Sequence, residues 1–282
     1  MIRRRVALAV LHGIGAQRRD WAEGFVRRVR RTVETRFPGI DVYPEVIWWA
    51  PVTQQYEDTL IRRYRRGLSW QWLRRLVIGY GGDVIAYQAP PRHDVAPPWT
   101  YRAVHGRIDR RLRVLAALLG TAPAARGPVP LVAVAHSLGS VILSDFVYDA
   151  QAAAGPGALR ARYGLALRAL FSLGSPLALY ALRYPHLGFD RPIALDGDAR
   201  WVNALYRPDV IAYPLGPAGP AYAAAVEDWI LPLRWWPWYW TPLAHLAYWN
   251  DRHLVGRVAA ELARVAALPV ASSSWRRSPS AS

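Results

Sequence analysis

Short apolar runs alternate with amphipathic segments along most of the chain. Continuous apolar runs of this length are typical of parallel strands that helices cover on both faces. The runs that we interpret as strands are Val6 to Leu11, Val42 to Trp49, Val129 to Ala135, Leu167 to Leu173 and Trp201 to Tyr206. Strands that alternate with helices predict an α/β fold with a mostly parallel sheet and right-handed crossovers.

Several segments between these runs have the periodicity of amphipathic helices. From Trp21 to Phe37 an apolar residue recurs every four positions with Arg and Glu between. We expect Asp20 to cap this helix and Pro38 to stop it. Further helices are predicted from Thr100, over Leu138 to Ala150, and over Leu254 to Val265.

The stretch from about residue 51 to 99 interrupts the alternation. It is rich in Arg and aromatic residues, and we interpret it as an insertion in a single domain of residues 1–268. Leu68, Trp72 and Leu76 lie at four-residue spacing among arginines, which is typical of a lid, of a membrane-surface helix or of a helix packed on the core. The Ser-rich tail, residues 269–282, is expected to be disordered.

The chain carries a formal net charge of +16, and every basic residue besides histidine is Arg. This bias has two interpretations: a plain preference for Arg, or attraction to an anionic surface such as a phospholipid headgroup layer. We therefore keep peripheral contact with an anionic membrane as a possible partner interaction. No zinc-finger spacing or RNA-recognition signature occurs, so nucleic acid is not an expected partner.

Cysteine is absent, which excludes a disulfide framework and Cys-ligated metal ions. The start, MIRRRVALAVLHG, superficially resembles a signal peptide, but its apolar run is short and leads directly into His-Gly. No segment offers the roughly 20 uninterrupted apolar residues of a membrane-spanning helix. The compartment stays open, with a cytoplasmic location slightly favoured.

The run AHSLGS places Ser137 between an apolar strand and a helix. That is the setting of a G-x-S-x-G nucleophile elbow, in which a sharp turn exposes a reactive serine. Ala135 stands where the motif usually has Gly, and Gly139 keeps the other small position. Small residues are needed because the turn brings the two backbones close together. Ser137 is the predicted nucleophile.

Together with His12-Gly13-Ile14-Gly15 after the first strand, this elbow resembles the α/β-hydrolase family. The resemblance implies an α/β-hydrolase fold, here with a sheet trimmed to about six strands. It also implies an oxyanion hole made by the backbone N–H groups of Ile14 and Leu138. Loss of one such donor typically costs about 10²- to 10³-fold in rate. Standing alone, the His-Gly-Ile-Gly run would be a tight turn.

A serine hydroxyl needs a general base, and the base needs an orienting acid. The family keeps the order Ser, acid, His along the chain. The stretch WVNALYRPDV puts Asp209 just past a predicted strand, where similar enzymes keep the acid, and Trp201 and Asn203 match their Trp-x-Asn pattern. Four other aspartates remain as alternatives, each interpretable as a solvated loop residue: Asp196, Asp198, Asp228 and Asp251.

His245 is the predicted base because it lies in a loop before the closing helix. Its main alternative, His253, falls within that helix pattern and is more typical of a surface or packing residue. His136 neighbours the nucleophile, but adjacent strand positions point to opposite faces. His93, His105 and His186 have no supporting pattern. In the run FSLGSPL we assign Ser175 a structural role, since no helix follows an elbow there.

An exceptional density of tryptophan precedes and follows His245, from Trp229 to Trp249. These rings either cover the edge of the sheet or form an apolar wall or interfacial patch for an acyl group. His12, Gly13 and Trp240 are the candidate substrate-binding residues.

The sequence thus predicts a serine hydrolase that cleaves carboxylic esters of an apolar acyl or lipid-like substrate through an acyl-enzyme on Ser137. His245 acts as base and then as acid, Asp209 orients it, and no cofactor is needed. Two alternatives stay open: an acyltransferase with the same three residues, and a non-catalytic binding protein on a hydrolase scaffold.

Overall fold

The computed structural model describes residues 3–13, 18, 20–64, 87, 99–121, 127–180, 192–232 and 242–268. Four sequence predictions lie outside these residues: Ile14, Trp240, the amphipathic pattern from Leu68 to Leu76, and the tail from residue 269. A helix, α2 (Pro51–Tyr64), occupies the start of the predicted insertion. The extent of that insertion stays a prediction.

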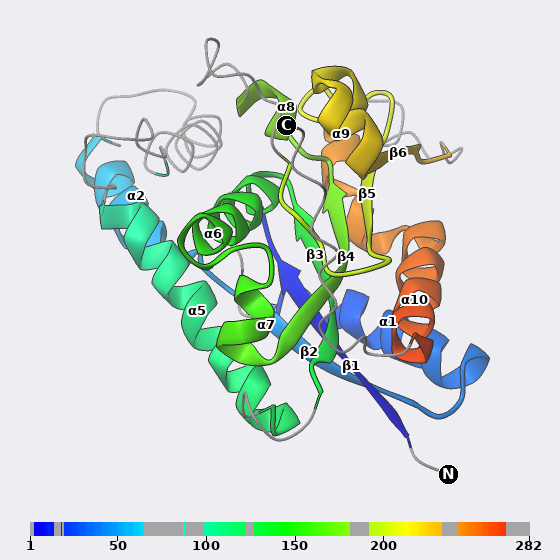
Figure 1. The fold of residues 1–282 in the computed structure, drawn as a ribbon. Coiled ribbons are helices and arrows are strands. Elements are labelled where there is room, and N and C mark those ends of the chain that lie inside the picture. The colour runs from blue at the N-terminus through cyan, green and yellow to red at the C-terminus, as the bar shows by residue number, and fades with distance from the viewer. Residues whose placement is uncertain are drawn as a thin grey trace, which may run out of the picture.

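Six parallel strands form one sheet with the order β2-β1-β3-β4-β5-β6 (Figure 1). The strands are β1 (Arg4–Leu11), β2 (Ile40–Ile47), β3 (Val129–His136), β4 (Leu165–Leu173), β5 (Arg200–Leu205) and β6 (Val226–Ile230). This confirms the expected parallel sheet of about six strands with helices on both faces. β2 and β6 are its edge strands, and Pro44 of β2 lies opposite Leu8 of β1.

All five predicted strands are present, with ends that differ by at most two residues. The sixth strand, β6, was not predicted. It is a short edge strand with the sequence VEDWI, which contains no continuous apolar run. Its burial pattern explains the omission: only Val226 is buried, and Glu227 and Ile230 are exposed. Edge strands are covered on fewer sides than central ones, so their sequences are less apolar.

Helices lie on both faces of the sheet, and alternate residues of β1 point to the two sides. Ala7, Ala9 and Leu11 pack with α5 and α6, whereas Val6, Leu8 and Val10 pack with α1 and α10 (Figure 1). The remaining bounds are α1 (Glu23–Arg36), α5 (Trp99–Leu119), α6 (Leu138–Ala154), α7 (Ala158–Tyr163), α8 (Leu177–Tyr180), α9 (Pro220–Ala225), α10 (Arg252–Ala267), η3 (Gly216–Ala218), η5 (Pro242–Leu246) and η6 (Tyr248–Asn250).

The start of α1 differs from the prediction. The N-cap residue is Ala22, no side chain caps the helix, and the carboxylate of Asp20 accepts hydrogen bonds from Arg18 instead. Asp20 lies in the turn before the helix, where its backbone carbonyl and not its side chain accepts from the amide of Glu23 (3.0 Å). The predicted apolar face is correct, since Phe25, Val29 and Val33 are buried.

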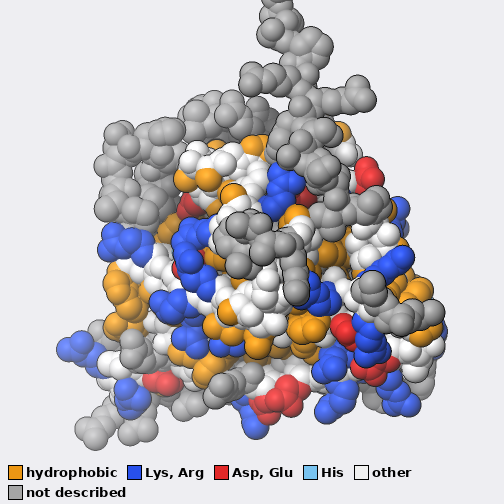
Figure 2. Space-filling model, turned by 60° about the horizontal axis from the view of Figure 1, so that its bottom comes forward, with side chains coloured by type: hydrophobic (Ala, Val, Ile, Leu, Met, Phe, Trp, Pro, Cys, Tyr) orange, Lys and Arg blue, Asp and Glu red, His pale blue; other side chains and the backbone are white. Residues whose placement is uncertain are grey.

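The basic side chains do not gather in a single block on the face shown in Figure 2, where the first strand begins. They are spread among apolar and acidic side chains over that surface. Among the helices of the described residues, none combines the length and the apolar character needed to cross a membrane.

Candidate active site

Ser137 occupies a strained turn between β3 and α6. Its φ of 52° and ψ of −131° make it the one described non-glycine residue with a positive φ. Such a conformation costs free energy and persists only where surrounding contacts enforce it. Here the Ser137 amide donates to the carbonyl of Leu173 in β4 (2.8 Å), and the Ser137 carbonyl accepts from the amide of Ser140 (2.9 Å). The strain therefore falls on the predicted nucleophile.

Two glycines let the end of β1 approach this turn. A Cβ atom added at Gly139 would lie 2.2 Å from the carbonyl oxygen of His12, and one added at Gly13 would lie 2.6 Å from Cβ of Ser137. No side chain fits at either position without moving backbone. The His12-Gly13 segment consequently lies in direct contact with the serine turn.

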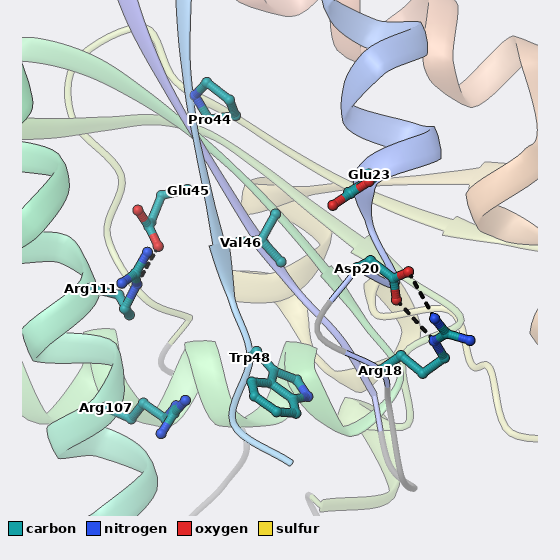
Figure 3. Close-up of a pocket in the computed structure, with 9 residues that line it drawn as sticks. All are labelled: Arg18, Asp20, Glu23, Pro44, Glu45, Val46, Trp48, Arg107 and Arg111. Atoms are coloured by element: carbon teal, nitrogen blue, oxygen red, sulfur yellow. Dashed lines mark hydrogen bonds and ion pairs between the residues drawn. The ribbon is translucent and has the colours of Figure 1, made fainter. Parts of the chain in front are cut away.

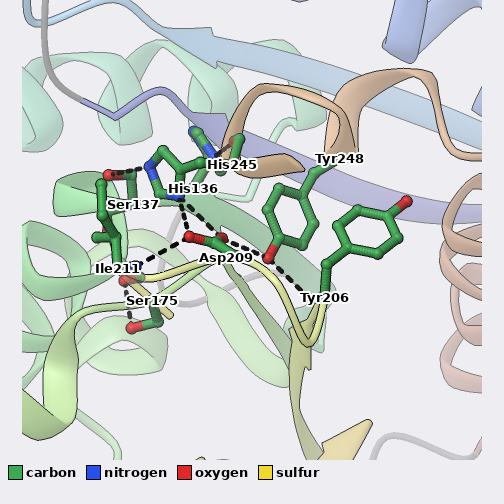
Figure 4. A network of polar contacts seen from close by, with 9 residues as sticks. His136, Ser137, Ser175, Tyr206, Asp209, Ile211, His245 and Tyr248 are labelled. Carbon is green, nitrogen blue, oxygen red and sulfur yellow. Dashed lines mark hydrogen bonds and ion pairs between the residues drawn. The ribbon is translucent and has the colours of Figure 1, made fainter. Parts of the chain in front are cut away.

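Ser137, His245 and Asp209 form a chain of hydrogen bonds (Figure 4). His245 Nε2 lies 2.9 Å from Ser137 Oγ, and His245 Nδ1 lies 2.9 Å and 3.1 Å from the two carboxylate oxygens of Asp209. The three come from the β3–α6 turn, from the segment after β5 and from η5, and none is more than 3% exposed. With Asp209 ionised, Nδ1–H donates to the carboxylate and Nε2 accepts the serine proton. The structure thus brings all three predicted residues together.

The surroundings of Asp209 favour its charged form. Burial raises the pKa of Asp209, but the hydrogen bond and charge of His245, and the donors Tyr248 Oη and Ile211 N–H, outweigh burial and lower that pKa below its ordinary value. A carboxylate with several donors is stabilised as an anion. Asp209 is therefore ionised at neutral pH.

Three of the four alternative aspartates have structural partners, whereas Asp198 is exposed, as expected. Asp251 is fully buried, so its interpretation as a solvated residue is wrong: it accepts from Tyr206 Oη (2.6 Å) and caps α10 through two backbone amides. Asp228 accepts from the side-chain amide of Asn203 and from two backbone amides near η3. Asp196 accepts from the amide of Leu167 in β4 (2.9 Å). These three aspartates therefore stabilise the ends of strands and helices and do not bond His245.

Of the alternative histidines, His136 contacts the proposed base from behind. Its Nε2–H donates to the carbonyl of His245 (2.8 Å), and its burial lowers its pKa to about 3. His136 is therefore neutral and supports the loop of η5. His253 is exposed on α10, and His105 bonds Tyr87 on the α5 side. His93 and His186 lie outside the described residues.

The imidazole of His12 is used within the protein. Nε2 accepts from the backbone amides of Trp49 (3.1 Å) and Ala50 (3.2 Å), which leaves Nδ1–H to donate to the carbonyl of Gly13 (2.6 Å). Burial lowers the pKa of His12 to about 3, so the ring is neutral. The ring joins the end of β1 to the segment that follows β2. The predicted contact of His12 with substrate stays a prediction.

The predicted oxyanion donors are only partly described. Leu138 directly follows Ser137 as the first residue of α6 and is 1% exposed. Ile14, its predicted partner donor, and Trp240 lie outside the described residues.

A serine pair below the nucleophile holds its backbone. Ser140 Oγ–H donates to the carbonyl of Ser137 (2.6 Å), so the hydroxyl of Ser175 is the donor in the 2.7 Å contact between Ser175 Oγ and Ser140 Oγ. Ser175 Oγ also accepts from the amide of Leu177 at 3.1 Å. These contacts agree with the structural role expected for Ser175.

Gly174 was not singled out by sequence reasoning, although its backbone lies next to the side chains of Asp209 and His245. Its φ is +55°, and an added Cβ would lie 2.7 Å from Tyr248 Cε2, 3.0 Å from Asp209 Oδ2 and 3.1 Å from His245 Nδ1. The Gly-Ser-Pro turn was the available signal for this position. Its glycine permits both the backbone conformation and the close approach.

An open groove of about 880 Å³ follows the edge strand β2 (Figure 3). It is lined by Arg18, Asp20, Glu23, Pro44, Glu45, Val46, Trp48, Arg107 and Arg111. Arg111 bonds Glu45, and the guanidinium of Arg107 lies 5.7 Å from the centre of the Trp48 ring. None of the three residues around Ser137 lines this groove, so we treat it as a separate region.

Comparison with known proteins finds remote structural similarity only. No family model and no curated protein matches the sequence. One similar structure is an assigned hydrolase of the α/β superfamily from Xanthomonas campestris pv. campestris. It has 11% identity and a TM-score of 0.37, over 92% of this chain and 97% of its own.

Two further solved structures are similar to the chain. The esterase domain of a Rhodothermus marinus protein has 12% identity and a TM-score of 0.33, over 92% of this chain and 86% of its own. An uncharacterized protein from Pseudomonas aeruginosa has 10% identity and a TM-score of 0.30, over 76% of this chain and 37% of its own. Similarities this remote support no inference about the reaction. The parallel sheet, the strained serine between β3 and α6 and the order Ser, Asp, His along the chain are by themselves the features of an α/β-hydrolase fold.

Proposed function

We propose that the chain is a serine esterase whose nucleophile is Ser137. The observation that carries this proposal is the buried hydrogen-bonded chain from Ser137 Oγ through His245 to Asp209, which starts at a strained turn. Strain and burial both cost free energy, so a fold retains them together where they serve a function. A binding scaffold has no need of a histidine base aligned with a buried serine in a strained turn.

The contacts support the following reaction. Ser137 Oγ attacks the ester carbonyl while its proton moves to His245 Nε2, and Asp209 stabilises the imidazolium that forms. His245 then gives this proton to the departing alkoxide, which leaves as the alcohol and an acyl-enzyme. Water attacks the acyl-enzyme with His245 again as base, and the carboxylic acid is released. Backbone N–H groups of Leu138 and Ile14 are the proposed donors to the oxyanion.

Exposed apolar side chains around the three residues favour an apolar acyl group. Val210 and Leu246 directly follow Asp209 and His245 and are 64% and 59% exposed. Leu179 of α8 and Tyr213, whose amide donates to the carbonyl of Ser175, are also exposed. Exposed apolar residues on the segments that carry a reactive group are typical of a binding surface. The substrate class that we propose is therefore an ester with an apolar acyl chain.

Labelling with a fluorophosphonate probe tests the nucleophile. Wild type should label, and Ser137→Ala should not. Ser144→Ala is the matched control, because Ser144 is buried in α6, seven residues after Ser137, and should leave labelling intact. A wild type that fails to label, or a Ser137→Ala variant that labels as wild type does, would contradict the proposal.

A series of p-nitrophenyl esters of increasing chain length tests the substrate class. We expect kcat/KM to rise with acyl length, and Val210→Ser to raise KM for long chains more than for acetate. Val114→Ser is the control, since Val114 is 42% exposed on α5, outside this cluster. Equal rates for all chain lengths, or preference for acetate, would refute an apolar acyl pocket and leave the nucleophile assignment standing.

A further inference from the structure

Tyr248 contacts the carboxylate of Asp209 but is not one of the three residues Ser137, His245 and Asp209. It lies in η6, is fully buried, and its Oη donates to Asp209 Oδ2 at 2.7 Å (Figure 4). The same oxygen accepts from the backbone amide of Tyr206 at 3.1 Å. A phenol has one proton to donate. Because the Tyr206 amide occupies the acceptor side, the proton of Tyr248 is directed at Asp209.

Tyr248 stays protonated, as a donor must. Burial, the nearby charge of Asp209 and the hydrogen bond to it all raise the pKa of Tyr248 well above its ordinary value. The phenol therefore donates to the carboxylate throughout the pH range in which an esterase works.

The carboxylate of Asp209 is held from three directions. Its Oδ1 accepts from the amide of Ile211 (3.0 Å), and its Oδ2 receives both Tyr248 Oη–H and the closer approach of His245 Nδ1. Two donors thus share one oxygen. Each takes part of the negative charge, so the strength of the bond to His245 depends on what Tyr248 withdraws.

The buried ring of Tyr248 is closely packed. A Cβ atom added at Gly174 would lie 2.7 Å from its Cε2, and the ring of Tyr206 lies 4.9 Å away, centre to centre. Tyr206 Oη in turn donates to Asp251, which caps α10. The end of β5, η6 and the start of α10 are joined through this pair of tyrosines.

We propose that Tyr248 is a positioning residue that fixes the orientation of Asp209 and moderates its hydrogen bond to His245. This inference rests on the proposed esterase function. It extends that function by naming a fourth side chain on which the rate and the pH dependence of the reaction depend. Tyr248 touches the carboxylate and not the reacting atoms, so its effect should appear in kcat and in the pH profile.

The test is Tyr248→Phe, which keeps the ring and removes one hydroxyl. Loss of a hydrogen bond to a charged group should lower kcat about 10- to 100-fold. KM should stay unchanged, because Tyr248 does not face the substrate. The acid limb of kcat/KM should move to higher pH, since a carboxylate that has lost a donor holds the imidazolium more strongly.

Tyr206→Phe is the matched control. It removes the hydroxyl that bonds Asp251 but keeps the ring and the backbone amide that bonds Tyr248. It should lower the thermal midpoint and leave the acid limb in place. If both variants lower activity only in proportion to lost stability, or if Tyr248→Phe matches wild type in kcat and acid limb, the positioning role is wrong.

A second variant covers the case in which Tyr248→Phe does not fold. Incorporation of 3,5-difluorotyrosine at position 248 keeps the hydroxyl and makes it a stronger donor, so the acid limb should move to lower pH. An unmoved limb would overturn the proposal. The low-field proton resonance of the Asp209–His245 bond gives a readout without substrate: it should shift in both Tyr248 variants and stay fixed in Tyr206→Phe. Failure of wild type to hydrolyse esters would refute the function, whereas an unshifted resonance would refute the role of Tyr248.

Discussion

Two regions of the molecule place a carboxylate about 3 Å from a basic nitrogen, but one pair is buried and the other is exposed. Around Ser137, the side chains of Asp209 and His245 lie 2.9 Å apart and are 0% and 3% exposed. In the groove along β2, Arg18 and Asp20 lie 3.2 Å apart and are 86% and 49% exposed. Distance alone does not distinguish these pairs.

The difference shows that burial and additional hydrogen bonds, and not distance, determine how strongly an ion pair acts. Water and salt screen the exposed pair, and its long side chains lose entropy when they pair. The buried pair is unscreened, and Tyr248 and the amide of Ile211 hold its carboxylate in one orientation. Four predictions follow from this contrast, in order of decreasing effect.

The largest effect is expected for Asp209→Asn. An amide keeps the shape of the carboxylate but does not hold His245 in the required tautomer, and the equivalent change in serine proteases costs about 10⁴-fold in kcat. Steady-state kinetics on the preferred ester would measure it. Asp20→Asn, in the exposed pair, should leave kcat unchanged, and an equal loss in both variants would abolish the distinction between the two regions.

Gly174→Ala should damage activity and stability together. The added methyl group would enter the space of Tyr248 and Asp209, and displacement of reacting groups by about 1 Å can cost about 10²-fold in rate. Gly120→Ala separates the two effects: Gly120 also has a positive φ, of +60°, but an added Cβ meets nothing within 4 Å. It should lose about 1 to 2 kcal/mol from backbone strain and keep its kcat, as kinetics and thermal melting would show.

Acid should destabilise the fold through the buried histidines His12 and His136. Burial lowers the pKa of each to about 3, below the value of about 6.5 in an unfolded chain. Between these values the unfolded chain binds more protons, so the stability that is present above about pH 6.5 is lost as the pH falls toward 3. The expected slope is about 1.4 kcal/mol per pH unit for each histidine.

Urea unfolding at pH 7 and pH 5 would measure this loss. His136→Gln should reduce the slope, whereas His253→Gln should not, because His253 is exposed on α10. A pH-independent unfolding free energy over this range would show that the two rings accept protons without leaving their sites.

The smallest effects belong to the groove. Arg18→Ala should change the unfolding free energy by about 0 to 1 kcal/mol, as is usual for exposed ion pairs. Arg111→Ala should cost more, about 1 to 3 kcal/mol, because the side chain of its partner Glu45 is only 4% exposed and would lose its donor. Equal costs, measured by urea unfolding, would mean that the burial of Glu45 does not matter.

Local sequence patterns were sufficient for the central strands and for the turn at Ser137, whereas Asp209 and His245 were predicted with the help of the chain order that the α/β-hydrolase resemblance implies. The apolar runs of β1 and β3 and the turn at Ser137 depend on neighbours in the chain, so they could be predicted. β6 could not, because an edge strand lacks a continuous apolar run. The mistaken cap at Asp20 arose because helix ends depend on where the preceding turn closes.

Long-range contacts explain the residues that sequence reasoning missed. Tyr248 lies in a segment crowded with aromatic residues, where any ring could be a core residue. Only the return of η6 onto the end of β5 brings its hydroxyl to Asp209. Asp251 was misread for the same reason, since its partner Tyr206 is 45 positions away.

Pro44 in β2 has a consequence for how this protein behaves among other copies of itself. An unpaired strand edge is a template on which another chain can add a strand, which leads to aggregation. Proline has no amide hydrogen, and strands tolerate it where the missing donor faces away from their neighbour. Among the described strands β2 has its neighbour on the β1 side only, and its register with β1 continues through Pro44, as is expected where the missing donor faces outward. Replacement of Pro44 by a residue with an amide hydrogen would restore that row and favour pairing of β2 with a strand of another copy.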